Sequence, residues 1–305
     1  MHSIPHPQVI MKRSQKENII KKIFFAFSFT SIVILGLIVF SLFQEGLPIF
    51  KKVSVAGFIF GMEWYPTYDP PSFGIFPLIV GSFIVTCVAT IIAVPMGVLA
   101  AVYIAEVAPP AMKEIFKTLI ELLAGLPSVV LGFFGMVIVA PWLQDTFDLP
   151  TGLNIVNAAL ILALMAIPTI ASISEDALYS VPREFKEASY ALGATKLETI
   201  TQVTIPAALS GISTGVILGM ARVMGETMVV LMVAGGSAAL PRSIFDSVRP
   251  LPASIAAEMG EAPFGGDHYH ALFATGIVLF LLTFLFSLIS DYIANKYKEV
   301  GSGTL

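Results

Sequence analysis

Long apolar stretches, separated by shorter polar ones, recur along the whole chain. A membrane-spanning helix needs about 20 predominantly apolar residues, and six stretches reach about that length: 23–43, 78–105, 119–143, 155–173, 207–234 and 271–293. Because backbone polar groups must be satisfied internally in lipid, each stretch is expected to be helical. Pro95, Pro127 and Pro168 fall inside three of them and predict kinks or breaks. The pattern therefore predicts an all-α polytopic membrane protein with six transmembrane helices.

Composition supports this interpretation. Hydrophobic residues make up 56% of the 305 residues and charged residues 12%, whereas a soluble domain carries about 25% charged residues. The mean hydropathy is +0.86. These values are not those of a soluble enzyme with a single membrane anchor. Cys87 is the single cysteine, which excludes an intrachain disulfide and a multi-cysteine metal site.

The basic residues predict how the spans are oriented. With the amino terminus inside, twelve Lys and Arg residues occupy inner segments and four occupy outer ones, and Arg222, inside a span, completes the 17. Lys and Arg favour the cytoplasmic side, so both termini are expected to be cytoplasmic. The chain then divides into 1–77, with a cytoplasmic amino terminus, the first transmembrane helix and an outer loop; 78–293, with five spans; and a cytoplasmic tail, 294–305.

The inner loop 174–206 carries the signals of a compact helix–turn–helix. Pro182 is suited to the start of a helix and Gly193 to a left-handed turn at its end. Thr195 and Glu198 have the spacing of a capping box, which predicts a second short helix. Three apolar residues share one face of the first helix: Phe185, Ala188 and Leu192. One interpretation is a solvated connector between spans; the apolar stripe favours the other, docking into a groove of a partner.

Within this loop the sequence resembles the permease subunits of ABC importers. Their pattern is E-A-A, three residues, G, nine residues and I-x-L-P, and this chain has Glu187-Ala188-Ser189, Gly193 and Val203-Thr204-Ile205-Pro206 at that spacing. Three further segments are similar to the PstC-type permease of phosphate-specific importers: "FPLIVGSFIVTCVATIIAVPMGVLAAVYIAEVAPP", "LIELLAGLPSVVLGFFGMVIVAP" and "GMARVMGETMVVLMVAGG". The resemblance covers residues 73–293, and the first span more weakly.

This resemblance implies a type I ABC importer permease fold, with residues 78–293 as the transmembrane type-1 domain. It implies that the chain is not an enzyme but a multi-pass subunit of the cell membrane that translocates inorganic phosphate. Expected partners are ATP-binding cassette ATPase subunits, a second permease of the PstA type and an extracytoplasmic phosphate-binding protein; nucleic acid is not expected. The sequence has no G-x-x-x-x-G-K-[ST] phosphate loop, so ATP is used by the partner and no cofactor is expected on this chain. The residues that the resemblance assigns to ATPase coupling are Phe185, Glu187, Ala188, Gly193 and Pro206.

Arg222 and Glu226 are charged residues inside the apolar stretch 207–234. On a continuous helix they fall within one arc of about 80° together with Gly211, Gly215 and Gly219, a stripe suited to close helix packing. Their i, i+4 spacing would also allow them to pair. One interpretation is a salt bridge between spans. We favour the other, a role in translocation or gating, because ionisable groups inside a bundle mark substrate routes and arginine suits an oxyanion.

Other candidates carry weaker signals. Asp267, His268 and His270 lie in a polar loop whose spacing does not favour a metal site. The segment 125–128, Gly-Leu-Pro-Ser, interrupts a span and either lines a cavity or kinks the helix. The metalloprotease motif H-E-x-x-H is absent. The alternatives for function are a permease for another oxyanion, such as molybdate, tungstate, sulfate or phosphonate, and a passive anion channel, which would need no ATPase contact.

Overall fold

The computed structural model of this chain describes residues 7–298; residues 1–6 and 299–305, with parts of the predicted cytoplasmic amino terminus and tail, lie outside the described residues. Within 7–298 the chain is mostly helical and has one two-stranded sheet, so the predicted all-α fold class is confirmed. The longest helices are α1 (Pro7–Gly46), α3 (Phe76–Val102), α7 (Ile155–Tyr179), α11 (Leu209–Met224) and α14 (Asp267–Lys298).

Five helical segments of the described chain are long and apolar enough to cross a membrane: Ile20–Lys51, Phe76–Val107, Ser128–Phe147, Ile155–Tyr179 and Asp267–Ile289. A sixth arises if the helix pair Lys196–Ala207 and Leu209–Met224, bent by 68°, crosses as one span. The predicted number of six spans agrees with this count.

Two of the predicted spans are not continuous helices. In 119–143, α4 (Pro110–Ala124) ends at Gly125 and α5 (Ser128–Phe134) begins after Pro127, because the residue before a proline is disfavoured in a helix. The chain then runs through a π-helical turn, η3 (Gly135–Val139), into α6 (Ala140–Phe147). In 207–234, α11 is followed by the short helix α12 (Met228–Val233) after the break 225–227.

The two broken spans meet at the helices that follow their breaks. A Cβ atom added to Gly132 in α5 would lie only 2.8 Å from the Sδ atom of Met232 in α12. Small residues permit such close approach of helices in a membrane. The break at 125–127 therefore does more than kink one helix, since it lets α5 pack directly on α12.

Helix α7 lies at the centre of the bundle and packs against α3 and α11. Its residue Ile170 fits between two glycines: a Cβ atom on Gly97 of α3 would lie 2.8 Å from Ile170, and one on Gly219 of α11 would lie 2.7 Å from it. Gly211 approaches Ala177 of α7 in the same way. The predicted glycine stripe of α11 thus faces α7, and the three helices form a tightly packed block.

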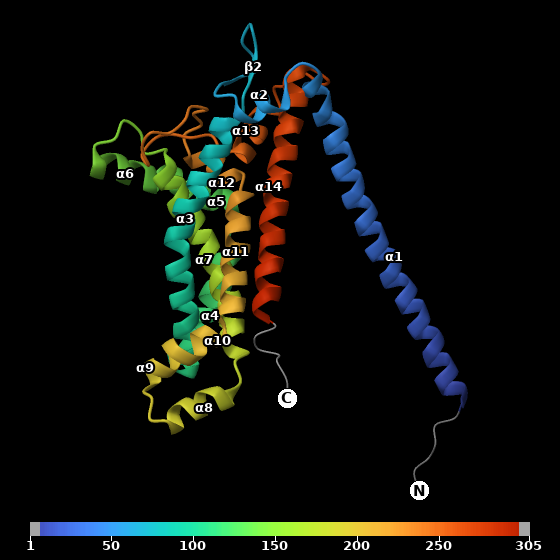
Figure 1. The fold of residues 1–305 in the computed structure, drawn as a ribbon, viewed down its shortest axis with the longest axis vertical. Helices are drawn as coiled ribbons and strands as arrows, with labels where there is room; N and C mark the ends of the chain where they lie inside the picture. The colour runs from blue at the N-terminus through green and yellow to red at the C-terminus, as the bar shows by residue number, and fades with distance from the viewer. Residues whose placement is uncertain (1–6, 299–305) are drawn as a thin grey trace.

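Helix α1 diverges from the rest of the bundle (Figure 1). Its contacts concentrate near its carboxyl end, where Gly46 approaches the backbone of α14 at residues 273–274. Between residues 20 and 38 its side chains are exposed, most of them large and apolar. Such a surface is stable only against lipid or another membrane protein.

Two layers of short elements lie at opposite ends of the bundle (Figure 1). One end carries η1 (Leu47–Lys51), α2 (Val55–Phe60), the hairpin β1 (Trp64–Tyr65)–β2 (Ser72–Phe73) and α13 (Leu251–Glu258). The other end carries α8 (Arg183–Ala191), α9 (Lys196–Thr199), the π-helical turn η4 (Ile200–Thr204) and α10 (Ile205–Ala207). A third π-helical turn, η2 (Tyr103–Val107), follows α3 near this layer. The loops 44–77 and 235–270 therefore share one end, and the loop 174–206 lies at the other.

Candidate functional site

The first helix of the loop 174–206 forms where the sequence predicts it. Pro182 caps α8, and Gly193 adopts a left-handed conformation with φ of +89° just beyond its end, a conformation that glycine adopts at little cost. The capping box is confirmed, because the Thr195 side chain accepts from the backbone N–H of Glu198 while the Glu198 carboxylate accepts from that of Thr195. This loop is therefore an ordered surface and not a loose connector.

The face of α8 that points away from the bundle carries the predicted apolar residues. Phe185 and Ala188 are exposed, and Leu192 is 89% exposed. Glu187 and Gly193 are exposed on the same segment, and so is Pro206 in α10. The five residues that the resemblance assigns to ATPase coupling are thus all accessible. An exposed apolar face on an ordered helix is suited to a protein partner.

Other residues of α8 are tied to the bundle and to α9 by polar contacts. The Nζ atom of Lys186 lies 2.6 Å from the Oε1 atom of Glu106 in η2. The hydroxyls of Ser189 and Thr199 are 2.9 Å apart and join α8 to α9. Sequence reasoning missed the Lys186–Glu106 pair, because its members are 80 residues apart and no local pattern connects them.

The structure corrects the expected pairing of Arg222 and Glu226. Helix α11 ends at Met224, so Glu226 lies in the break rather than one turn further along the same helix. Its Oε1 atom accepts from the backbone N–H groups of Met228, at 3.2 Å, and Val229, at 3.5 Å. A carboxylate is favoured at the amino end of a helix, and this position competes with pairing to the arginine.

Arg222 makes a different contact. Its Nη1 atom donates to the Thr169 hydroxyl of α7 at 3.3 Å, and the side chain is exposed. Among the side chains that the structure describes, no ion pair involves Arg222. The salt bridge with Glu226, the less favoured of the two interpretations of the sequence, is not formed, and the guanidinium stays available to another partner.

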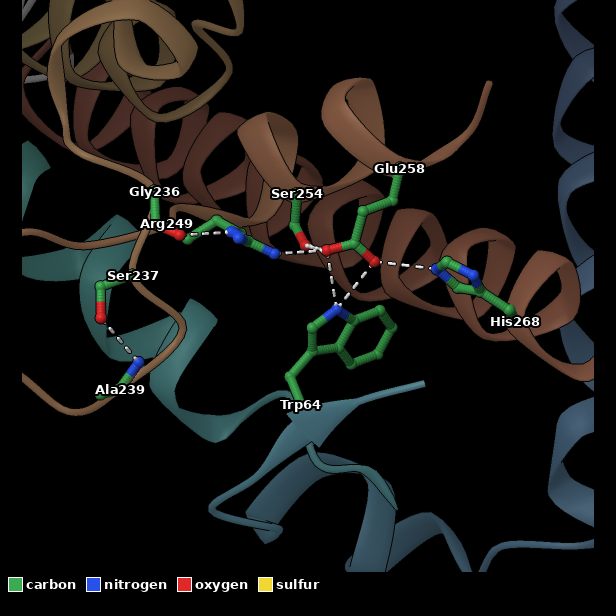
Figure 2. A network of polar contacts seen from close by, with 8 residues as sticks. All are labelled: Trp64, Gly236, Ser237, Ala239, Arg249, Ser254, Glu258 and His268. Carbon is green, nitrogen blue, oxygen red and sulfur yellow. Dashed lines mark hydrogen bonds and ion pairs between the residues drawn. The ribbon is translucent and has the colours of Figure 1, made fainter. Parts of the chain in front are cut away.

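A polar network that the sequence did not reveal lies at the other end of the bundle, around Glu258 of α13 (Figure 2). The indole N–H of Trp64 donates to both carboxylate oxygens, at 3.1 and 3.0 Å. Arg249 forms an ion pair with Oε1, and its Nε donates to the Gly236 carbonyl at 2.8 Å. The Nε2 atom of His268 lies 2.8 Å from Oε2. One carboxylate thus joins the hairpin, the segment before α13 and the start of α14.

This network borders an open cavity of about 590 Å³. Its wall includes Tyr65 and Thr67 of the hairpin, Ser237 of the segment after α12, and a second carboxylate, Glu261. Both acidic and basic groups line it, so its charge does not favour an anion over a cation. The members come from sequence positions far apart, and no motif spacing could have brought them together beforehand.

The three residues weighed as metal ligands have separate partners. Asp267 pairs with Lys52 at 2.6 Å, His268 belongs to the Glu258 network, and His270 Nδ1 lies 2.7 Å from the Glu45 carbonyl. In the part of the chain that the structure describes, no group of three or more His, Cys, Asp or Glu residues converges. The contacts hold the loops and the start of α14 in place.

With this geometry in view, the chain can be compared with known proteins. Residues 93–299 match the family described as binding-protein-dependent transport system inner membrane component. The chain is 40% identical over 246 residues to the probable ABC transporter permease protein YqgH of Bacillus subtilis. The matched region covers 81% of this chain and 80% of that protein. It is 34% identical over 287 residues to the phosphate transport system permease protein PstC of Mesorhizobium japonicum, with 87% and 86% covered.

Solved structures show the same architecture. The crystal structure of a bacterial alginate ABC transporter, in complex with an alginate pentasaccharide-bound periplasmic protein, matches with a TM-score of 0.65 over 95% of this chain and 99% of that one. At 13% identity this likeness speaks for the fold alone. The predicted permease fold and the resemblance to PstC-type permeases are both confirmed. The chain is a multi-pass membrane protein that belongs to the family of binding-protein-dependent transport system inner membrane components, as an ABC transporter permease.

Proposed function

We propose that this chain is the permease subunit of an ATP-driven importer that translocates inorganic phosphate, with Arg222 on the translocation route. The observation that carries the proposal is Arg222 itself, an exposed cation near the end of a membrane-spanning helix, with no ion-pair partner among the described side chains. A guanidinium facing lipid is costly. Its exposed face is therefore directed to a partner subunit or to a water-filled route between subunits.

The chemistry of arginine suits phosphate. Its planar guanidinium donates in pairs to the oxygens of an oxyanion and stays charged at any physiological pH. Thr169 engages Nη1 at 3.3 Å, a long contact, so most of the donors remain open to a passing anion. Glu226 contributes to gating in a different way from a salt bridge, because its carboxylate positions the start of α12 beside the break.

The remaining parts of the assembly follow from the two ends of the bundle. The exposed residues Phe185, Glu187 and Ala188 of α8, with the turn at Gly193, dock on an ATP-binding cassette ATPase, which supplies the ATP hydrolysis. Both termini and α8 are cytoplasmic, and the end with the hairpin faces the extracytoplasmic phosphate-binding protein. A second permease of the PstA type completes the route and covers apolar surface that this chain leaves exposed.

The relatives give the support for phosphate over other anions. Proteins named as phosphate transport system permease protein PstC from Mesorhizobium japonicum and Haemophilus influenzae are 34% and 30% identical to this chain over 87% and 93% of its length. Molybdate, tungstate, sulfate and phosphonate offer arginine similar oxygens, so they remain the alternative substrates. A passive anion channel is a weaker alternative, because it has no use for an exposed docking face on α8.

The test is transport by the reconstituted complex. Proteoliposomes that contain this chain, its partner permease and the ATPase are loaded with ATP and supplied with binding protein and labelled phosphate. We expect ATP-dependent uptake that unlabelled phosphate suppresses and that sulfate, molybdate, tungstate and phosphonate suppress only weakly. Uptake without ATP would indicate a channel, and stronger competition by another oxyanion would reassign the substrate.

A matched pair of arginine variants tests the route. Arg222→Gln should assemble normally and lose most uptake, because an amide cannot replace a charged, two-pronged donor. Arg242→Gln removes the same charge from an exposed arginine of the segment after α12 and should leave uptake unchanged. Full uptake by Arg222→Gln would remove Arg222 from the route.

A further inference from the structure

The ion pair between Lys186 and Glu106 connects the cytoplasmic-layer helix α8 to the membrane helix α3. The two charged atoms are 2.6 Å apart, and the side chains are 22% and 11% exposed. Exposed ion pairs contribute little to stability. This pair is largely withdrawn from water, so the attraction between its charges is less screened. Lys186 is half-buried while Phe185 and Ala188 of the same helix are exposed, so α8 is held by the bundle and still presents its apolar residues.

The end of α3 that receives this lysine is braced from a second direction. Glu106 belongs to the π-helical turn η2, and Lys113 of α4 donates to the carbonyl of Ala105 in the same turn at 2.9 Å. Lys113 also donates to the hydroxyl of Tyr179, at the end of α7, at 3.0 Å. Polar contacts therefore fix η2 to α4 and α7 as well as to α8. A displacement of α8 would act on a turn that is already joined to the bundle.

From η2 a continuous packed path leads to Arg222. Helix α3 continues from η2 to Gly97, which lies against Ile170 of α7, and Ile170 lies in turn against Gly219 of α11. Gly219 and Arg222 are three residues apart on the same helix. Because closely packed side chains leave little room to adjust, a shift of α3 would be passed to α11 instead of being absorbed between the helices.

We propose that the Lys186–Glu106 ion pair is the positioning contact that passes movement of the ATPase-docking helix to α3, and through α7 and α11 to the translocation route. This inference rests on the proposed function as an ATP-driven importer. The pair touches neither ATP nor the transported anion. Its loss should leave the ATPase bound and active while uptake no longer follows hydrolysis.

The experiment measures phosphate uptake and ATP hydrolysis together in proteoliposomes that contain the complete complex. Lys186→Met and Glu106→Gln keep the size of each side chain and remove the charge. We expect each to retain ATPase binding in co-purification and to reduce the phosphate transported per ATP by roughly fivefold or more, the size of a typical coupling between sites. The exchanged pair, Lys186→Glu with Glu106→Lys, should recover most of the lost ratio.

A matched control separates coupling from a general effect of losing an ion pair. Lys52 and Asp267 form a pair of the same length, 2.6 Å, at the opposite end, where their side chains are 63% and 40% exposed. Lys52→Met should leave the ratio unchanged. A normal ratio in both Lys186→Met and Glu106→Gln would overturn the proposal.

Loss of ATPase binding in Lys186→Met that the exchanged pair does not recover would also overturn the proposal, because Lys186 would then be a docking residue. Failure of the proposed function gives a different result, since the wild-type complex itself would show no ATP-dependent phosphate uptake.

Discussion

Replacing Glu258 by alanine should loosen the end of the bundle that carries the hairpin, because this carboxylate accepts from Trp64 and Arg249 and contacts His268. The change removes the acceptor of the Trp64 indole N–H, and Trp64 is only 2% exposed; an unsatisfied buried donor costs about 1–3 kcal/mol. It also removes the ion pair of Arg249, and a hydrogen bond to a charged group contributes about 1.5–3 kcal/mol. Arg249 keeps its bond to the Gly236 carbonyl and part of its water contact, which offsets part of the loss. We therefore expect the free energy of local opening at this end to fall by about 3 kcal/mol in total.

Hydrogen exchange measures this loss locally. A change of about 3 kcal/mol corresponds to an increase of about 100-fold in the population of the locally opened state. Peptides covering the hairpin and residues 235–262 should exchange faster by about that factor in the purified full-length chain, while peptides from α7 keep their rates. Glu258→Gln keeps an acceptor oxygen and should give an intermediate value.

Glu261→Ala is the matched control for this measurement. Glu261 borders the same cavity and is exposed, and its side chain makes no hydrogen bond or ion pair with the described residues. It should leave exchange within a few-fold of wild type. Equal exchange in the Glu258→Ala and Glu261→Ala variants would show that the network contributes nothing to the order of these loops, and the reasoning would fail.

Three further predictions concern the rest of the chain. Gly193→Val forces a β-branched residue into a φ of +89° and should reduce substrate-stimulated ATP hydrolysis by the complex while membrane insertion stays normal; wild-type coupling would contradict the docking role of this loop. Gly219→Leu inserts a side chain where an added Cβ atom already meets α7 at 2.7 Å, so it should lower thermal stability by about 1–3 kcal/mol, whereas Gly36→Leu, with open space around it, should not. A cysteine at Lys196 should react with a membrane-impermeant reagent only after permeabilisation and one at Glu261 without it, and the opposite result would reverse the orientation.

Local signals account for the parts of the fold that the sequence predicted. The six apolar stretches, the turn at Gly193 and the capping box of Thr195 and Glu198 each depend on residues close together in the chain. Their physics is that of one helix or one turn, and a single stretch of sequence contains all of it. The helix–turn–helix of the loop 174–206 was predicted correctly because its signals are local.

The parts that were missed or mistaken depend on choices between competing contacts. Treating 207–234 as one helix was wrong, because Gly225 ends α11 and the carboxylate of Glu226 satisfies the start of α12. Lys186–Glu106 and the Glu258 network each join residues from separate elements. Such contacts exist only once the elements have packed, and charge patterns along the chain do not single them out.

The position of Ile170 between Gly97 and Gly219 has a consequence for where this permease can bend. Neither glycine leaves space for α3 or α11 to slide past α7, so these three helices should travel as one rigid body during a transport cycle. The breaks at 125–127 and 225–227 are then the expected hinges for α5 and α12, because helical hydrogen bonding is already interrupted there. Under the proposed function, we expect α5 and α12 to be the segments that move relative to the block of α3, α7 and α11.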